Sequence, residues 1–110
     1  MPVWIASPIG VKRCIDLLQW RVMETVPDGT LHFAGRNAAN YRGRVSSEIL
    51  AYDASARRGR TRSGRLYRLR GPAGFAGVGE YVWAVWCLHN HVSDYRDVTH
   101  LYAEAQDDDA

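Results

Sequence analysis

The residues of this sequence best suited to chemistry are arginines, and they are concentrated in one short stretch. Only Lys12 is a lysine, so almost every basic side chain carries a guanidinium fork. Because this fork binds carboxylates and phosphates through two parallel hydrogen bonds, the stretch predicts a surface that recognises acidic groups. Residues 57–70 contain no acidic side chain and hold half of the fourteen basic residues: Arg57, Arg58, Arg60, Arg62, Arg65, Arg68 and Arg70.

Three interpretations of this stretch stay open. Arginines on a hairpin could follow a nucleic-acid phosphate backbone, or they could meet an acidic patch of a partner protein. They could also form a solvated sheet face that the acidic C-terminal third neutralises, because residues 79–110 carry seven acidic side chains and one basic one. Burial is excluded, since each buried charge would need its own partner. The candidate contacts are Arg58, Arg60, Arg62, Arg65 and Arg68.

A further candidate contact is Trp83, one of four tryptophans. Aromatic side chains can stack on nucleic-acid bases, but most of those in this chain fall at core-facing positions of predicted elements. Trp83 departs from the apolar stripe of a predicted helix, and an exposed tryptophan can anchor a partner protein. We therefore expect Trp83 to be exposed and to take part in binding.

The alternation of Cys87, His89 and His91 gives little support for a metal site. On a helix these three positions diverge, and the sequence offers no second ligand pair at a spacing typical of zinc. We expect no metal and no cofactor. The two cysteines, Cys14 and Cys87, are expected to be free thiols.

Catalysis is equally weakly indicated. The sequence has no nucleophile elbow, no phosphate-binding glycine loop and no His-Glu-x-x-His motif. A small ribonuclease needs a general base and an arginine that binds phosphate, which His32 or His100 with Arg65 or Arg68 would supply. Because no spacing brings these residues together, we expect no catalytic residues.

The elements that must position the arginines are mostly strands. Residues 17–26 and 30–36 flank a Pro-Asp-Gly turn and predict a hairpin, with Leu18, Trp20 and Val22 on one face. The next predicted strands are residues 44–52, with Val45, Ile49 and Ala51 on one face, then residues 58–62 and residues 65–70, the last two joined at Ser63-Gly64, with Tyr67 and Leu69 near the core.

One amphipathic helix is predicted over residues 78–90, because apolar residues recur there at helical spacing. That stripe consists of Val78, Tyr81, Val82, Val85, Trp86 and His89. A core is expected from Trp20, Phe33, Ile49, Leu69, Val82, Val85 and Trp86. Residues 95–103 favour an edge strand, with a helix beginning near Asp97 as the alternative.

These elements predict an α+β fold, because strands and helices do not alternate. We expect an antiparallel sheet of about five strands with one main amphipathic helix packed on one face. Residues 1–105 would form a single domain that begins with an extended segment at residues 1–10, and residues 106–110 a flexible acidic tail.

Composition points to a cytoplasmic protein that does not contact membranes. The longest apolar run, residues 81–88, is too short to span a bilayer. The N-terminus lacks the basic start and long apolar stretch of a secretory signal. The oligomeric state stays open.

Three segments together resemble a pattern found in small uncharacterised proteins of phages, prophages and other mobile elements: GRVSS at residues 43–47, TRSGRLY at 61–67 and EYVW at 80–83. Such proteins are often non-enzymatic inhibitors that dock on a host defence complex, as anti-CRISPR proteins do. The resemblance implies a host protein or nucleoprotein complex as partner and assigns no site residue.

We therefore expect a non-enzymatic interaction protein, in its most specific form an anti-CRISPR-like inhibitor of a host nucleic-acid-guided defence complex. A nucleic-acid-binding module that uses the arginine hairpin is the first alternative, and a small ribonuclease is the second.

Overall fold

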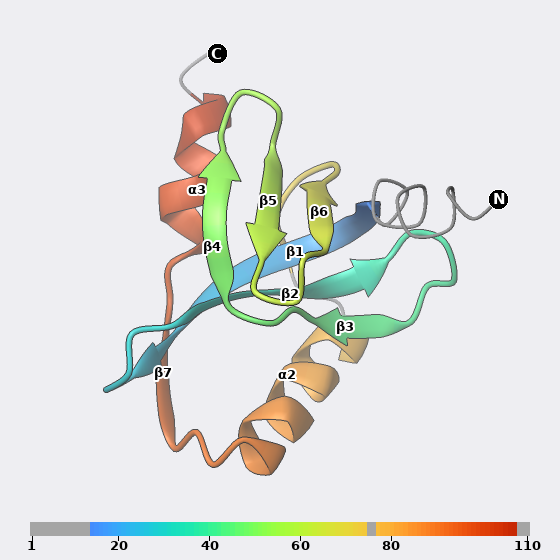
Figure 1. The fold of residues 1–110 in the computed structure, drawn as a ribbon. Helices are drawn as coiled ribbons and strands as arrows, with labels where there is room; N and C mark the ends of the chain where they lie inside the picture. The colour runs from blue at the N-terminus through green and yellow to red at the C-terminus, as the bar shows by residue number, and fades with distance from the viewer. Residues whose placement is uncertain (1–13, 75–76, 108–110) are drawn as a thin grey trace, which may run out of the picture.

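The computed structural model describes residues 14–74 and 77–107, the last four by their backbone alone, and shows an α+β fold (Figure 1). The segment expected to be extended at residues 1–10 lies outside the described residues. No helix in the described part of the chain has the length and apolar character of a membrane span.

The elements are β1 (Cys14–Val26), β2 (Leu31–Asn37), β3 (Gly43–Val45), β4 (Ile49–Asp53), β5 (Arg58–Thr61), β6 (Leu66–Leu69), α2 (Gly77–His89), β7 (Asp94–Asp97) and α3 (Thr99–Asp107).

The strands form one mixed sheet in the order β3-β2-β1-β6-β5-β4, and β7 pairs with the second half of β1. Every neighbouring pair is antiparallel except β1 and β6, which run parallel over residues 14–17 and 66–69. The predicted α+β class is confirmed, but the sheet has more than five strands and is not wholly antiparallel. The parallel partners lie far apart in the sequence, so no local turn could indicate their direction.

The hairpin of β1 and β2 forms as its sequence predicts. The Thr25 N–H donates to the Thr30 carbonyl at 2.9 Å, and the Gly29 N–H donates to the Thr25 carbonyl at 2.7 Å. Gly29 has a φ of +76°, which side chains of L residues rarely tolerate, so this turn requires glycine.

A bulge in β1 changes which residues share a face. Gln19 has a φ of +48°, and the register with β2 shifts between Leu18 and Arg21. As a result Leu17, not Leu18, joins Trp20 in the same core. The prediction that Leu18 shares the face of Trp20 is therefore wrong, because one extra residue breaks the two-residue period of a strand.

The single strand predicted over residues 44–52 is two strands. β3 pairs with β2, whereas β4 pairs with β5 at the opposite end of the sheet. The chain crosses between them at residues 46–48, where the Ser46 hydroxyl accepts the Phe33 N–H at 2.9 Å. Ala51, which was expected to face inward, is exposed.

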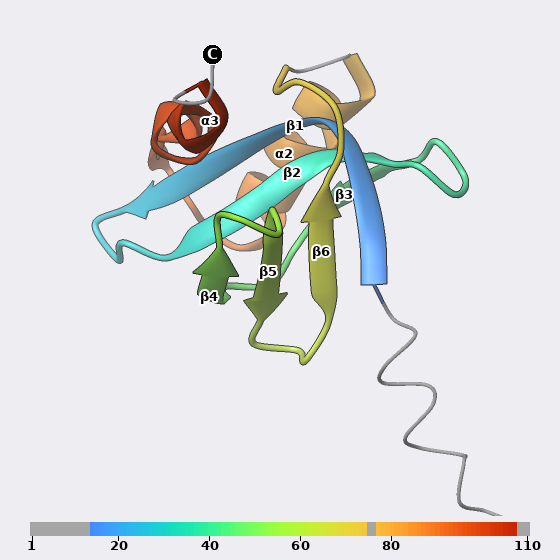
Figure 2. The same cartoon turned by 90° about the horizontal axis from the view of Figure 1, so that it is seen from above.

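The two faces of the sheet carry different cores. We call the face that bears Trp20 the inner face and the opposite face the outer face. The sheet curls over its inner core, so that the rings of Phe33 on β2 and Tyr52 on β4 lie 6.2 Å apart, and Tyr102 of α3 packs against both. Figure 2 shows β1 bending, so that its first residues run beside β6 and the rest continues toward α3. The inner core consists of Leu17, Trp20, Val22, Phe33, Ile49, Tyr67, Leu69 and Val98.

Helix α2 lies on the other side of β1 and β2 from α3 and β4 (Figure 1). It covers a second, smaller core on the outer face. The members of this outer core are Met23, Ala34, Trp83 and Cys87, with Val45, Trp86 and Val92 partly buried around them.

The helix forms where predicted, but it is rotated about its axis. Cys87 is buried and Tyr81 is 67% exposed, the reverse of the predicted stripe. Val82, Val85 and Trp86 are only half-buried, so the expectation that they join the core of Trp20 is wrong. The reason is that α2 packs over β2 and the short edge strand β3, beyond which no further strand supports it in the described structure.

Residues 95–103, for which an edge strand was favoured and a helix from near Asp97 was the alternative, contain the end of a strand and the start of a helix. β7 pairs with the second half of β1, and α3 begins at Thr99, whose N–H donates to Asp97 Oδ1 at 2.9 Å. α3 continues to Asp107, so the first residues of the expected tail are helical.

Candidate functional site

The arginine hairpin forms, and its strands turn their arginines to the outer face of the sheet. Along β5 the exposed Arg58 and Arg60 alternate with buried residues, and on β6 the exposed Arg68 lies between two buried residues. Gly59 permits this packing, because a Cβ there would lie only 2.5 Å from the Phe33 ring. We call the outer surface of β4, β5 and β6 the arginine face.

Strand register places two arginines between two acids in a row across the arginine face. Arg58 pairs with Arg68 across β5 and β6, Asp53 pairs with Arg58 on one side, and Asp16 pairs with Arg68 on the other. Directly opposed like charges repel on a sheet, and a flanking acid offsets this repulsion. The row Asp53-Arg58-Arg68-Asp16 thus carries no net charge.

Asp16 forms ion pairs with Arg68, which was a predicted contact, and with Arg70. Arg68 donates from Nε to Oδ1 at 3.0 Å and from Nη2 to Oδ2 at 3.1 Å, and Arg70 donates from Nη1 to Oδ2 at 3.1 Å. The hydrogen bond from Arg68, with its charge and that of Arg70, lowers the pKa of Asp16. Arg68 is therefore part of an internal ion pair.

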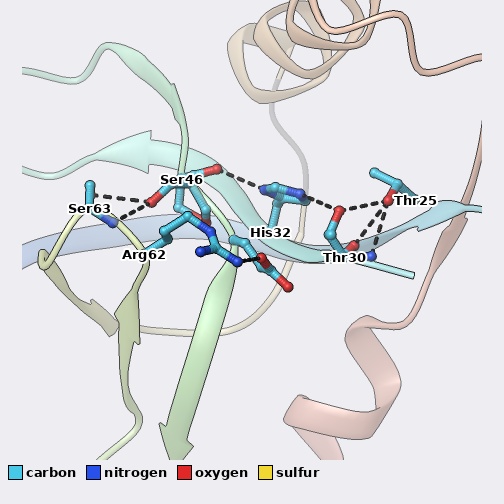
Figure 3. Close-up of polar contacts among 8 residues, drawn as sticks. Thr25, Thr30, His32, Ser46, Arg62 and Ser63 are labelled. Atoms are coloured by element: carbon cyan, nitrogen blue, oxygen red, sulfur yellow. Dashed lines mark hydrogen bonds and ion pairs between the residues drawn. The ribbon is translucent and has the colours of Figure 1, made fainter. Parts of the chain in front are cut away.

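The hairpin tip is fastened to the crossover between β3 and β4. Arg62 forms an ion pair with Glu48 at 2.5 Å, and the Ser63 N–H donates to Ser47 Oγ at 3.1 Å (Figure 3). At the far end of β5, Arg57 lies over the Trp20 ring and donates to the Gly71 carbonyl at 2.7 Å. Arg62 and Arg57 thus have structural contacts.

Three arginines of the hairpin take part in none of the ion pairs found among the described residues: Arg58 and Arg60 on the arginine face, and Arg65 directly before β6. A hollow of about 310 Å³ opens beside two of them, lined among others by Asp53, Arg58, Arg60 and Leu66. Arg60 pairs across the sheet with Leu66 and Ala51, neither of which is charged.

The described acids beside the arginines come from the first half of the chain. They are Asp16, Glu48 and Asp53, whereas Asp97 pairs with Arg21, which is not part of the arginine face. Strand order places β1 and β4 beside β5 and β6 and leaves β7 on the other half of β1, so none of the described C-terminal acids forms an ion pair with the arginine face. Sequence reasoning missed these acids, since only the register brings them to the arginines.

Trp83 does not offer the exposed anchor that the sequence predicted. It is 2% exposed, its ring stacks on Trp86 with centroids 5.1 Å apart, and Tyr95 contacts it edge-on at 5.3 Å. Its Nε1–H is buried without an acceptor in the described structure. The correction follows from the rotation of α2, which turns Trp83 toward the sheet.

His32, a candidate base for ribonuclease chemistry, is buried in a hydrogen-bond chain (Figure 3). Its Nδ1 lies 2.9 Å from the Ser46 carbonyl, which can only accept, so Nδ1 carries the proton and Nε2 accepts from the Thr30 hydroxyl at 2.9 Å. Burial lowers the pKa of His32 and favours the neutral ring. Both ring nitrogens are thus engaged within the fold, and Arg68 is engaged with Asp16 on another part of the outer face.

Metal ligands do not gather in the part of the chain that the structure describes, where no group of three His, Cys, Asp or Glu side chains could hold an ion. Cys14 and Cys87 are both free thiols.

No protein-family model matches the chain, and comparisons with curated proteins and with solved structures found no similar protein. Conclusions about function therefore rest on the geometry of the site.

Proposed function

We propose that the chain is a non-enzymatic interaction protein that binds a protein partner through its arginine face. The observation that carries the proposal is the hollow beside Arg58 and Arg60, in a face whose remaining arginines are largely paired. A partner could place an apolar side chain in the hollow and a carboxylate on Arg60 or Arg65, which supplies the central anchor of an interface and its polar rim.

The mixed charge of the face favours a protein over a nucleic acid as the partner. Asp16 and Asp53 occupy the two ends of the central row, where they would repel successive phosphates of a nucleic-acid backbone. A protein surface can instead present both signs of charge and match the row. Nucleic-acid binding is the alternative, because Arg60 and Arg65 form no ion pair among the described residues and could contact phosphates.

The more specific proposal is that the partner belongs to a host nucleic-acid-guided defence complex, which the chain inhibits. Its support is the resemblance of residues 43–47, 61–67 and 80–83 to small mobile-element proteins. The test is to titrate the protein into a panel of purified guide-loaded nuclease complexes and to measure target cleavage. We expect stoichiometric inhibition of one complex, and cleavage at full rate across the whole panel would contradict the proposed inhibition.

The arginine face is tested with matched variants in the same assay. R60E/R65E should weaken inhibition by about tenfold or more, and R60K/R65K should restore only part of it, because lysine keeps the charge but loses the fork. R96E serves as the control, because Arg96 is an exposed arginine on β7. Equal inhibition by R60E/R65E and wild type would remove the arginine face from the interface.

The nucleic-acid alternative is tested with DNA and RNA of defined length. A protein-binding module should bind them weakly, whereas phosphate contacts would give an affinity that falls steeply as salt increases. Tight, salt-dependent binding that R60E/R65E abolishes would replace the proposed function with the alternative.

A further inference from the structure

A second surface of the molecule is an apolar groove between α2 and β3, with a volume of about 320 Å³. We call it the α2–β3 groove. One wall is β3, and the other is a stripe of α2 in which Tyr81, Val85 and His89 follow at intervals of four residues, with Val82 and Trp86 beside them. No acidic side chain is found among the described residues that line the groove.

Strand β3 lies at the edge of the sheet that the described residues form. The Arg42 carbonyl accepts the Asn37 N–H at 2.8 Å, and the Ser46 N–H donates to the Phe33 carbonyl at 2.9 Å, so even-numbered residues of this segment face β2. Antiparallel pairing alternates, and the N–H and C=O groups of Gly43 and Val45 therefore point away from β2. These groups are the ones to which a further strand would bond.

Gly43 brings the helix close to this edge. A Cβ at this position would lie 2.6 Å from Val82 Cγ1 and 2.8 Å from the Val78 carbonyl oxygen, so any larger residue would push α2 away. The first turn of α2 therefore lies beside the Gly43 end of β3, and the side-chain stripe of α2 continues along the groove.

The Gly43 end of the groove is basic. Arg36 lies opposite Gly43 on β2, and Arg42 precedes Gly43 in the chain. Arg44 also borders the groove, but its Nε donates to the Tyr67 hydroxyl at 3.0 Å and its guanidinium lies over the Tyr67 ring, which holds this side chain on the inner face. None of these arginines takes part in an ion pair among the described residues, and Arg36 Nε is buried without an acceptor there. Glu80, in the first turn of α2, is exposed and does not line the groove.

We propose that the α2–β3 groove binds an extended segment of a partner protein as an additional strand on β3. Alternate apolar side chains of this segment enter the groove, and a carboxylate at one end meets the arginines beside Gly43. Backbone hydrogen bonds to Gly43 and Val45 supply affinity, and the apolar positions and the acid supply specificity, as in other cases of strand addition. This site is separate from the arginine face of the proposed function.

Charge complementarity selects this occupant over a second copy of the chain. Two β3 edges paired with each other would bring the arginines of both copies together, which costs energy without an acid to offset it. Pairing of two three-residue β3 edges would also bury far less than the roughly 1,200 Å² that a stable dimer interface needs, whereas a linear segment can fill the groove as well as pair with the edge.

The test uses a phage-displayed library of random linear peptides, selected on the full-length protein and counter-selected on V85E. Enriched peptides should alternate apolar residues and carry an acidic residue or a free carboxyl terminus at one end. In amide NMR spectra, a synthetic peptide of the enriched sequence should shift residues 43–45 and 81–89. N-methylation of the peptide nitrogens that pair with β3 should weaken binding about tenfold or more.

Folding is controlled with a second variant, Y81E, because Tyr81 is largely exposed and its replacement should leave the fold intact. Y81E should weaken peptide binding, whereas R60E/R65E should bind the peptide as wild type does, which separates this site from the arginine face. The proposal is overturned if no peptide is enriched, if enriched peptides bind Y81E and wild type equally, or if they are basic. A dimer that Y81E dissociates would assign the edge to a second copy instead.

Discussion

The arginine face and the α2–β3 groove lie on the same outer side of the sheet, yet their charges are arranged differently. In the arginine face, Asp16 binds Arg68 and Arg70, and Glu48 binds Arg62. Near the Gly43 end of the groove, no ion pair of the described structure includes Arg36, Arg42 or Arg44, and Arg44 donates instead to the Tyr67 hydroxyl at 3.0 Å.

The difference shows that charge density along a sequence is a poor guide to the charge that a surface presents. The run over residues 57–70 is dense because two neighbouring strands carry arginine on the same face. Its neutralising acids come from β1 and β4, which flank those strands in space. The three arginines near Gly43 have no acidic partner among the described side chains.

The largest expected effect concerns the core beneath the groove. Trp83→Ala should lower the free energy of unfolding by roughly 3–5 kcal/mol, because a fully buried aromatic ring is lost. Trp86→Ala should cost less, because Trp86 is half-buried and lines the groove. Urea denaturation of both variants measures the difference, and an equal or larger loss for Trp86→Ala would show that the groove is closed in solution.

A smaller effect is expected from the close contact that forms the groove. Gly43→Ala should cost about 1–3 kcal/mol, because its Cβ overpacks against Val82 and the α2 backbone. Gly74→Ala is the matched control, since a Cβ there meets no atom within 4 Å. Thermal unfolding compares the two, and equal melting temperatures would mean that α2 does not rest on β3 as described.

The buried histidine below the groove predicts a dependence of stability on pH. Burial lowers the pKa of His32 below the ordinary value of 6.5, so below that pH the unfolded chain binds more protons than the folded one. The contribution of His32 is therefore complete above about pH 6.5 and is lost progressively as the pH falls. Urea denaturation between about pH 7.5 and 5 should show this decrease, and His32→Gln should flatten it. An unchanged slope in His32→Gln would assign the dependence to other groups.

The smallest change in stability is expected in the arginine face. Asp16→Asn should cost less than about 1 kcal/mol, because the paired side chains of Arg68 and Arg70 are about half exposed to solvent. The same change makes the face more basic and should increase its affinity for DNA and RNA in low salt. If the affinity stays unchanged, Asp16 does not govern the charge that the face presents.

The sequence by itself determined the features that depend on neighbouring residues. Alternation placed Arg58 and Arg60 on one face of a strand, and the Pro-Asp-Gly turn fixed the β1–β2 hairpin. Helical spacing located α2 to within one residue at each end. These features follow from backbone preferences and side-chain period, which act over a few residues.

Only the tertiary structure decided which distant residues these features contact. The bulge at Gln19, the split of residues 44–52 between two edges and the parallel pairing of β1 with β6 all depend on contacts between distant segments. The same holds for the site. Asp16 reaches Arg68 across 52 positions of sequence, and the packing of α2 against β2 and β3 turned Trp83 inward and left Tyr81 at the groove. Strand register and helix rotation minimise the free energy of the whole core, so no single segment encodes them.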